Sequence, residues 1–469
     1  RDYYASRGLG DVYKRQILTF STYLVPLMVF PYISRILGVD CIGAIDTIDN
    51  IIDYCILFSM MGMSTLGIRE IAKYKNDKKR LQETFNNLFW LNAISTIVVF
   101  FFLIVATICI PILQQRVVLL TIGTFKLFAN LFWIEWFYRG LEDFKYITIR
   151  SVIVRLLFIV SVFVFIKEKS DFTLYYILFV SIVIINAICN WTYKRNKVSL
   201  RFKHIALKAY AKPFIILGVF AMLSAIYTKL SIPVLSFTCG DTEAGYYATA
   251  TRMYQVVIAL ISSLISVLIP RMSVLIRESN YTEISHLFEL AFKMLFFISL
   301  PIIWYVEFLA PDIIAIFAGN EFVQAAIPMR IVIFLVLIIG SEQIYIMQLL
   351  IPLNKDKIVA VAGLCGVITW AILSTILVPL LHGIGTSIVW IATESVVLLI
   401  AIYYIKKTMG YHYPWKLFFL SCLESIPYAI MGGSLLLLVG QTYLRAVLIT
   451  ISFIIYSIFL WHKKKILAQ

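Results

Sequence analysis

Charged side chains are scarce in this chain of 469 residues. They make up 14% of it, whereas a typical soluble domain holds about 25%. Hydrophobic residues make up 61%, and the mean hydropathy is +0.90. A soluble chain of this length would form roughly three domains, each with a polar surface that this composition cannot supply. The composition therefore excludes a soluble enzyme, a soluble scaffold and a disordered chain, and it predicts an all-α membrane protein.

Cysteine and histidine are also few, and they lack the spacing of metal ligands. The seven cysteines form no CxxC motif, so we interpret them as buried free thiols without a disulfide framework or zinc site. The five histidines show no metal-binding spacing, and the chain lacks a P-loop and a nucleophile elbow. No catalytic residue, metal or cofactor is therefore predicted.

Residues 1–16 differ in character from the rest of the chain. They read RDYYASRGLGDVYKRQ, a polar and aperiodic string, and the chain becomes apolar at Ile17. The string resembles read-through of a sequencing adaptor and lacks the regions of a signal peptide. We expect a non-native segment here and a first helix whose true start is missing; the alternative is a native amphipathic N-terminus.

Apolar runs of about 20 residues, the length that crosses a bilayer core, are separated by charges, proline and glycine. The predicted spans are 17–34, 43–63, 85–110, 117–138, 147–166, 172–193, 213–236, 247–269, 291–309, 323–350, 358–380, 384–405, 417–439 and 441–461. We therefore predict about fourteen transmembrane helices.

Lysine and arginine are distributed unevenly between alternate loops. One side of the membrane holds 26 of them and the other holds five. Because positive residues accumulate in cytoplasmic loops, both ends of the chain are predicted to be cytoplasmic. The cations are spread over many short loops, so no nucleic-acid partner is expected. The basic face should instead attract anionic membrane lipid.

Two segments of the sequence repeat at an offset of 202 residues. The first motif and its copy are Pro31, Ser34, Gly38 and Gly43, and Pro233, Ser236, Gly240 and Gly245. Six predicted spans separate the two copies, so both copies face the same way, as in transporters whose halves alternate access. We expect an N-terminal six-helix bundle in 17–212 and a C-terminal one in 213–416. Residues 417–469 would add two helices and a basic tail.

Ionisable side chains inside the spans are the best pointers to function, because each is costly unless it meets water or a partner. Asp46, Asp49 and Asp53 share one face of the second span. Arg252 lies near the repeat equivalent of Asp49, so we expect it to face the same cavity.

Other cations inside the spans are Lys126, Arg155, Lys229 and Arg330. With Arg252 they would line a cationic cavity suited to a polyanion such as a diphosphate, because arginine binds phosphate bidentately and lysine supplies a point charge. The alternative is that these residues form mutual salt bridges or reach to the interface.

Five segments resemble one protein family: residues 30–38, 67–73, 140–145, 245–252 and 269–273. They read FPYISRILG, GIREIAK, GLEDFK, GYYATATR and IPRMS. Together they are similar to the bacterial polysaccharide-biosynthesis flippases, the O-antigen and capsule repeat-unit translocases of the multidrug/oligosaccharidyl-lipid/polysaccharide exporter superfamily. The resemblance covers about residues 17–465.

The resemblance implies two six-helix bundles plus two helices in the bacterial inner membrane. It implies export of an undecaprenyl-diphosphate-linked oligosaccharide from the cytoplasmic to the periplasmic leaflet, coupled to H⁺ or Na⁺, alongside a polymerase and glycosyltransferases. Arg252 occupies a cation position of the family, and Arg35 follows its Pro-Tyr-Ile-Ser motif. Asp46 and Asp49 replace the small hydroxyl residues common in the family, and Lys229 also departs from its pattern.

Two other functions stay open. A cation-coupled drug or small-molecule antiporter of the same superfamily would have a dominantly anionic cavity. A membrane polysaccharide polymerase or ligase would need a large external loop with catalytic arginine or histidine, and His382 is the only external histidine predicted. We expect Arg252, with Arg155 and Lys126, to bind phosphate or an acidic sugar. We expect Asp53 to take up a proton or sodium ion and to bias the return step.

Overall fold

The structure is a computed structural model of the 469-residue chain. It describes the backbone of residues 2–194, 197–201, 206–440 and 442–468. Side chains are described in these ranges except at 2–24, 217, 219–221, 223–224, 442–443 and 461–468. The prediction that residues 1–16 are non-native falls on side chains outside the described ones and stays a prediction.

The chain forms two compact units, residues 1–245 and 246–469. The first unit holds α1 (Asp2–Met60), α2 (Met63–Tyr74), α3 (Lys78–Cys109), α4 (Pro111–Gln114), α5 (Val117–Trp133), α6 (Glu135–Gly140), α7 (Phe144–Phe165), η1 (Lys169–Asp171), α8 (Phe172–Tyr193), α9 (Lys208–Cys239) and the first residues of α10 (Asp241–Arg277).

All the regular secondary structure described in the second unit is also helical. It holds the rest of α10, α11 (Tyr281–Phe317), η3 (Asn320–Ala325), α12 (Ala326–Val332), α13 (Leu335–Gln343), the π-helix η4 (Ile344–Leu350), α14 (Asp356–Met409), α15 (Trp415–Leu438) and α16 (Thr442–Ala468).

Nine described helices are long and apolar enough to cross a membrane, or ten if the bent pair Asn320–Val332 and Leu335–Leu350 makes one span. The two longest helices, α1 with 59 residues and α14 with 54, are too long for a single crossing of the membrane. A straight helix with the 54 residues of α14 would be about 81 Å long, against about 30 Å for the bilayer core. The prediction of an all-helical protein with many spans is confirmed, and the number fourteen stays a prediction.

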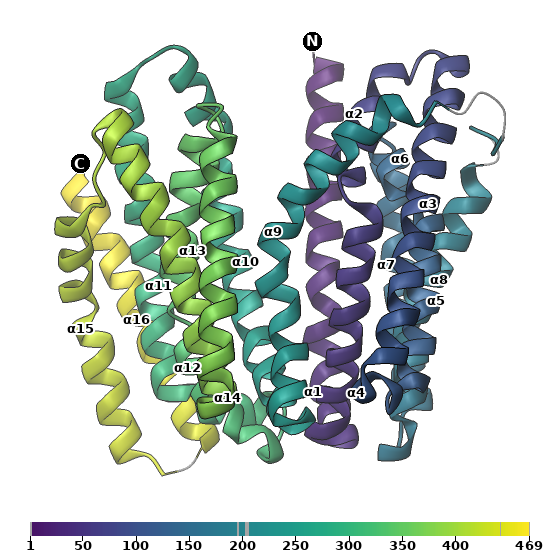
Figure 1. The fold of residues 1–469 in the computed structure, drawn as a ribbon. Helices are drawn as coiled ribbons and strands as arrows, with labels where there is room; N and C mark the ends of the chain where they lie inside the picture. The colour runs from purple at the N-terminus through teal and green to yellow at the C-terminus, as the bar shows by residue number, and fades with distance from the viewer. Residues whose placement is uncertain (1, 195–196, 202–205, 441, 469) are drawn as a thin grey trace. The chain divides into compact units, whose positions relative to one another are not determined.

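The two longest helices each contain one residue with non-helical backbone, Gly38 in α1 and His382 in α14. Both residues fall between predicted spans, so the sequence had placed these turns correctly. In Figure 1, α1 is drawn in purple as two limbs that meet at the bottom of the view.

The repeated glycines adopt the same backbone conformation. Gly38 has φ 76° and ψ 173°, and Gly240 has φ 95° and ψ 169°. This region of backbone space is open essentially to glycine alone. The repeat found in the sequence is therefore a structural repeat at these two turns.

The two turns also pack against each other reciprocally. A Cβ atom on Gly43 would lie 1.8 Å from the carbonyl oxygen of Asp241, and one on Gly245 would lie 2.4 Å from that of Val39. Asp241 is the repeat equivalent of Val39, so each turn buries the same glycine against the same position of the other. Such self-complementary contact is characteristic of surfaces related by a two-fold axis.

Polar side chains tie the same two turns together. Thr242 donates its hydroxyl to the carboxylate of Asp40, its repeat equivalent. Arg116, between α4 and α5, places Nη2 2.8 Å from Asp241 Oδ1 and donates Nη1 to Ser236 Oγ at 2.9 Å. Arg116 therefore holds the second turn against the start of α5.

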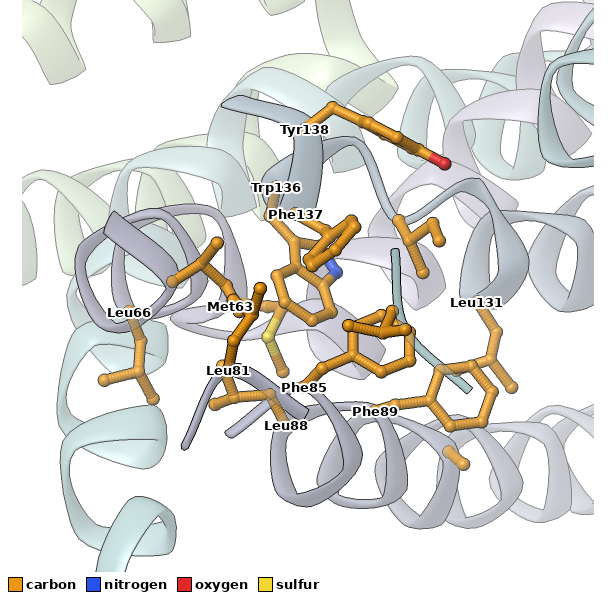
Figure 2. Packing of buried hydrophobic residues seen from close by; sticks show 14 of the residues in the cluster. Met63, Leu66, Leu81, Phe85, Leu88, Phe89, Leu131, Trp136, Phe137 and Tyr138 are labelled. Carbon is orange, nitrogen blue, oxygen red and sulfur yellow. The ribbon is translucent and has the colours of Figure 1, made fainter. Parts of the chain in front are cut away.

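An aromatic core holds the opposite end of the first unit together (Figure 2). Phe85 of α3 stacks on Trp136 of α6 and meets Phe137 edge to face. Gly67 of α2 lets the indole of Trp136 approach closely, since a Cβ there would lie 2.7 Å from the ring. The core fixes the short helix α6, and with it the residues that follow α5.

Helix α9 packs along α1 and belongs to the first compact unit. The sequence division into bundles 17–212 and 213–416 assigns α9 to the second bundle, because that division follows the repeat. The packing of α9 against α1 does not decide to which sequence repeat α9 belongs. The division into two bundles, with two extra helices in 417–469, therefore stays a prediction.

Candidate functional site

A network of ion pairs lies inside the first unit. Lys126 of α5 places Nζ between two carboxylates of α1, 2.6 Å from Asp49 Oδ1 and 2.7 Å from Asp53 Oδ1. Lys229 of α9 places Nζ 2.7 Å from Asp53 Oδ2. Tyr176 of α8 donates its hydroxyl to Asp49 Oδ1 at 3.3 Å. Four helices thus meet through this network.

Local sequence explains why these groups meet. Asp49 and Asp53 are four residues apart, which places both carboxylates on one face of α1. Gly123 lies one turn before Lys126 on α5. A Cβ at Gly123 would lie 2.5 Å from Ile52 and 2.9 Å from the hydroxyl of Tyr176. The glycine therefore allows α5 to approach α1 and α8 closely enough for Lys126 to reach both carboxylates.

The network is buried unevenly. The side chain of Lys126 is 9% exposed, whereas that of Lys229 is 40% exposed. The two carboxylates and two ammonium groups balance in formal charge, which offsets the cost of removing them from water. Lys229 is thus the most accessible ion of the set. If an anion drew the lysines away, the carboxylates would need another cation.

Four of the predicted site residues are therefore brought together: Asp49, Asp53, Lys126 and Lys229. The sequence left two alternatives open for the cations, a site for a polyanion or mutual salt bridges, and Lys126 and Lys229 form salt bridges in the structure. Asp46 lies one turn before Asp49 and takes no part in these three pairs; its carbonyl accepts from Asn50 at 2.8 Å. The roles of all five residues in binding stay proposals.

Two predicted cations of the first unit lie elsewhere. Arg35 is exposed and donates to the carbonyl of Pro31 on its own helix. Arg155 of α7 is half-buried. Neither residue belongs to the ion pairs around Asp53.

The other two predicted cations lie in the second unit. Arg330 of α12 donates Nε to the carbonyl of Glu307 at 2.9 Å. Arg252 is half-buried on α10. The expectation that Arg252 faces the same cavity as the α1 carboxylates stays a prediction.

Sequence reasoning missed a second ionic network, around Glu135 at the start of α6. Arg139 places Nη2 2.6 Å from Glu135 Oε1, and Arg150 places Nη2 3.3 Å from Oε2. Arg150 also donates to Asn190 and Ser151. Glu135 and Arg150 fall inside the predicted spans 117–138 and 147–166, and Arg139 falls between these spans. The residues that they contact come from α6, α7 and α8, which no single span reveals. Tyr176 was missed because a tyrosine in an apolar span carries no signal.

The second unit contains buried acids that the site prediction did not include. Glu342 of α13 is half-buried, and its Oε2 has no hydrogen-bond partner among the described residues. Trp390 donates Nε1 to Glu394 Oε1 at 3.1 Å. Asp312 of α11 accepts from Arg445 Nε of α16 at 2.8 Å. This last pair ties one of the final two helices to the unit.

Solved structures share this fold. The lipid II flippase MurJ, in an inward closed conformation, matches with a TM-score of 0.77 and 15% identity over 96% of this chain and 99% of that one. An inward-facing multidrug resistance transporter of the MATE family matches with a TM-score of 0.61 and 14% identity over 83% of this chain and 99% of that one. At such identities the likeness shows the fold alone.

Curated relatives are similar over most of their length. The chain is 25% identical over 408 residues to a protein assigned as an O-antigen transporter in Escherichia coli (strain K12), covering 82% of this chain and 94% of that protein. It is also 23% identical over 407 residues to a protein assigned as an O-antigen transporter in Shigella dysenteriae, covering 82% of this chain and 97% of that protein.

A family match covers more than half of the chain. Residues 16–276 match the family described as polysaccharide biosynthesis protein. This finding and the relatives confirm the resemblance seen in the sequence motifs. The family is one of transporters and not of enzymes. This multi-pass membrane protein therefore belongs to the polysaccharide biosynthesis protein family.

Proposed function

We propose that the protein flips undecaprenyl-diphosphate-linked oligosaccharide repeat units from the cytoplasmic to the periplasmic leaflet of the bacterial inner membrane. The observation that carries this proposal is the similarity to assigned O-antigen transporters along nearly their whole length. The substrate would then pass to a polymerase, after glycosyltransferases have built it. Fourteen helices, arranged as two parallel six-helix repeats plus two, would support alternating access with both termini in the cytoplasm.

The ion network of the first unit suggests how the substrate and a cation could be linked. A diphosphate and the carboxylates of Asp49 and Asp53 would compete for the same two partners, Lys126 and Lys229. When the lysines turn to the phosphates, the carboxylates are left close together in a region of low dielectric constant. A proton or sodium ion on Asp53 would relieve their repulsion. Binding of the substrate and of the cation would therefore favour each other.

Release of the phosphates would reverse this exchange. Lys126 and Lys229 would return to the carboxylates, and the cation would leave Asp53. The empty protein would then carry an internally neutral network through the membrane, which costs less than moving unpaired charges. On this mechanism the ion pairs of the structure are those of the empty site.

Replacement of Arg252 tests the function in cells. Arg252→Ala should abolish surface polysaccharide in a strain that depends on this protein, whereas Arg252→Lys should retain it, because lysine also binds phosphate as a point charge. Surface polysaccharide is measured by gel electrophoresis, and membrane insertion of each variant by immunoblotting. Normal polysaccharide in the Ala variant would remove Arg252 from the site. Drug efflux by the wild-type protein without any effect on polysaccharide would favour the antiporter function instead.

A further inference from the structure

We propose that a cavity at the end of α5, in the first unit, binds a sugar ring of the transported substrate. This inference rests on the proposed function, because the substrate of a repeat-unit flippase carries sugars. The cavity has a volume of about 290 Å³ and lies between α1, α2, α5 and α6. Ligand pockets usually measure about 300–1,000 Å³, so this one suits a single ring rather than a whole repeat unit.

The cavity continues the ion network along the same helix faces. Met60 lines it from α1, seven residues after Asp53, and Asn130 lines it from α5, four residues after Lys126. These spacings keep each pair on one side of its helix and correspond to rises of about 10 Å and 6 Å. A sugar bonded to a diphosphate lies directly beside its phosphates. A substrate whose phosphates contact Lys126 would thus place a sugar at the cavity.

The cavity wall combines apolar surface with hydrogen-bonding groups. Met60, Ile68 and two indoles provide the apolar part, and Ser64, Glu135 and Arg139 provide polar groups at the rim. A sugar ring has the matching character, with an apolar face of C–H groups and an edge of hydroxyls. Pockets of this kind, mostly apolar with a few placed polar groups, are typical of small-molecule sites.

Two residues of the wall each carry a buried side-chain donor that has no hydrogen-bond partner among the residues that the structure describes. The donors are Nδ2 of Asn130, a residue that is 8% exposed, and Nε1 of Trp133, one turn further along α5. Buried donors are nearly always satisfied, so two of them beside one cavity call for an explanation. The terminal torsion of asparagine is soft, and its rotation would turn the amide toward a ligand. Both nitrogens are buried, so a turn of each side chain would be needed to bring its N–H to a hydroxyl or acetamido oxygen of a sugar in the cavity.

The backbone at the cavity is held in an unusual conformation. Ile134, which lines the cavity, has φ 37° and ψ 34°, and a β-branched residue in this left-handed region is a genuine outlier. The aromatic core holds the strained segment in place by packing Trp136 against Phe85 and Gly67 (Figure 2). Strained residues of this kind gather at ligand sites, where surrounding packing maintains them. The strain turns the end of α5 so that Trp133 and Trp136 both line the cavity.

Binding measurements on the full chain in lipid nanodiscs test this site. The two probes are undecaprenyl diphosphate without sugar and the lipid-linked repeat unit extracted from the bacterium that encodes this chain. The wild-type protein should bind the sugar-bearing lipid more tightly. Trp133→Phe and Asn130→Ala should each reduce that preference about two- to tenfold, the effect of one lost hydrogen bond, and leave the affinity for the sugar-free lipid unchanged.

Two further variants keep the test independent of folding defects. Ser64 is exposed on α2, so Ser64→Phe should fold and should remove the preference by filling the cavity. Trp191→Phe is the matched control, because Trp191 packs on the same aromatic core without lining the cavity, and it should retain the full preference.

The outcomes separate this inference from the function on which it rests. Equal binding of both lipids by the wild type, or an undiminished preference in Trp133→Phe, Asn130→Ala and Ser64→Phe, would overturn the sugar site and leave the flippase function standing. Failure of the wild type to bind either lipid would overturn the proposed function and the sugar site together.

Discussion

At the scale of single residues, Lys126 is the centre of the site. Its ammonium is the one that contacts both Asp49 and Asp53 within the described network, and its side chain is largely buried. Lys229 reaches only Asp53 and is far more exposed. Loss of Lys126 would leave two neighbouring carboxylates without their shared partner. Loss of Asp49 would leave the lysine still paired with Asp53. The two changes should therefore differ in cost.

Replacement of Lys126 by methionine should destabilise the protein by about 3–5 kcal/mol, the usual cost of breaking a buried pair from one side. Asp49→Asn should cost less, because Lys126 keeps one carboxylate. Thermal unfolding of the purified protein in detergent measures both. Lys293→Met is the control, since Lys293 forms an exposed pair with Glu289 and its loss should change little. Wild-type stability of Lys126→Met would show that the network does not depend on this lysine.

The charge exchange proposed at Asp53 predicts the direction in which pH changes the affinity for the substrate. If substrate phosphates draw the lysines away and Asp53 then takes up a proton, lowering the pH from 8 to 6 should tighten the binding of undecaprenyl diphosphate. Asp53→Asn should bind with a weaker pH dependence. The titration of the lipid itself is common to both proteins, so the difference between them isolates Asp53. Equal pH dependence, with equal sodium dependence, would exclude coupling through Asp53.

At the scale of secondary-structure elements, the turn at Gly38 within α1 and the turn at Gly240 between α9 and α10 are built alike. In each, a glycine with positive φ ends one helix, and a second glycine five residues later packs against the other turn. Local sequence is sufficient to predict both turns, since the conformation is open essentially to glycine. Their mutual packing could be suspected only from the repeat, because the two turns are about two hundred residues apart.

A side chain at Gly43 should separate the two turns. In Gly43→Ala the added Cβ would lie 1.8 Å from the Asp241 carbonyl oxygen, so the backbone must move apart. In a background without native cysteines, Asp40→Cys with Thr242→Cys should form a disulfide on oxidation, since these side chains are in contact. Addition of Gly43→Ala should slow that cross-link. The control is Gly433→Ala, whose Cβ would meet its nearest neighbour at 3.9 Å. Equal cross-linking in both would refute the close packing.

At the scale of the whole molecule, the distribution of positive charge and the length of the helices predict the same membrane topology. Helix α7 has 22 residues, which correspond to about 33 Å and hence to one crossing of the bilayer core. The loops before and after α7 must therefore lie on opposite sides. The excess of lysine and arginine predicts that the loop before it is cytoplasmic.

Cysteine labelling of intact cells tests this topology. In a background without native cysteines, Ser170→Cys, after α7, should react with a membrane-impermeant maleimide added outside. Lys145→Cys, near the start of α7, should react only after the membrane is permeabilised. Both side chains are exposed, so the access of the maleimide to each position depends only on the side of the membrane where that position lies. The reverse pattern would invert the proposed orientation and the direction of transport.

The sequence by itself determined the class of the protein, most of its helices, the turns at Gly38 and Gly240, and the family. These features depend on apolar run length, on charge and on backbone conformation, which are local properties. Only the tertiary structure decided which charges neutralise one another. Lys126 meets Asp49 across 77 positions of the chain, and it does so because Gly123 allows two helices to approach closely. No periodicity within one helix reports such an encounter. The cations that the sequence suggested for a free phosphate site are therefore, in two cases, partners of the carboxylates beside them.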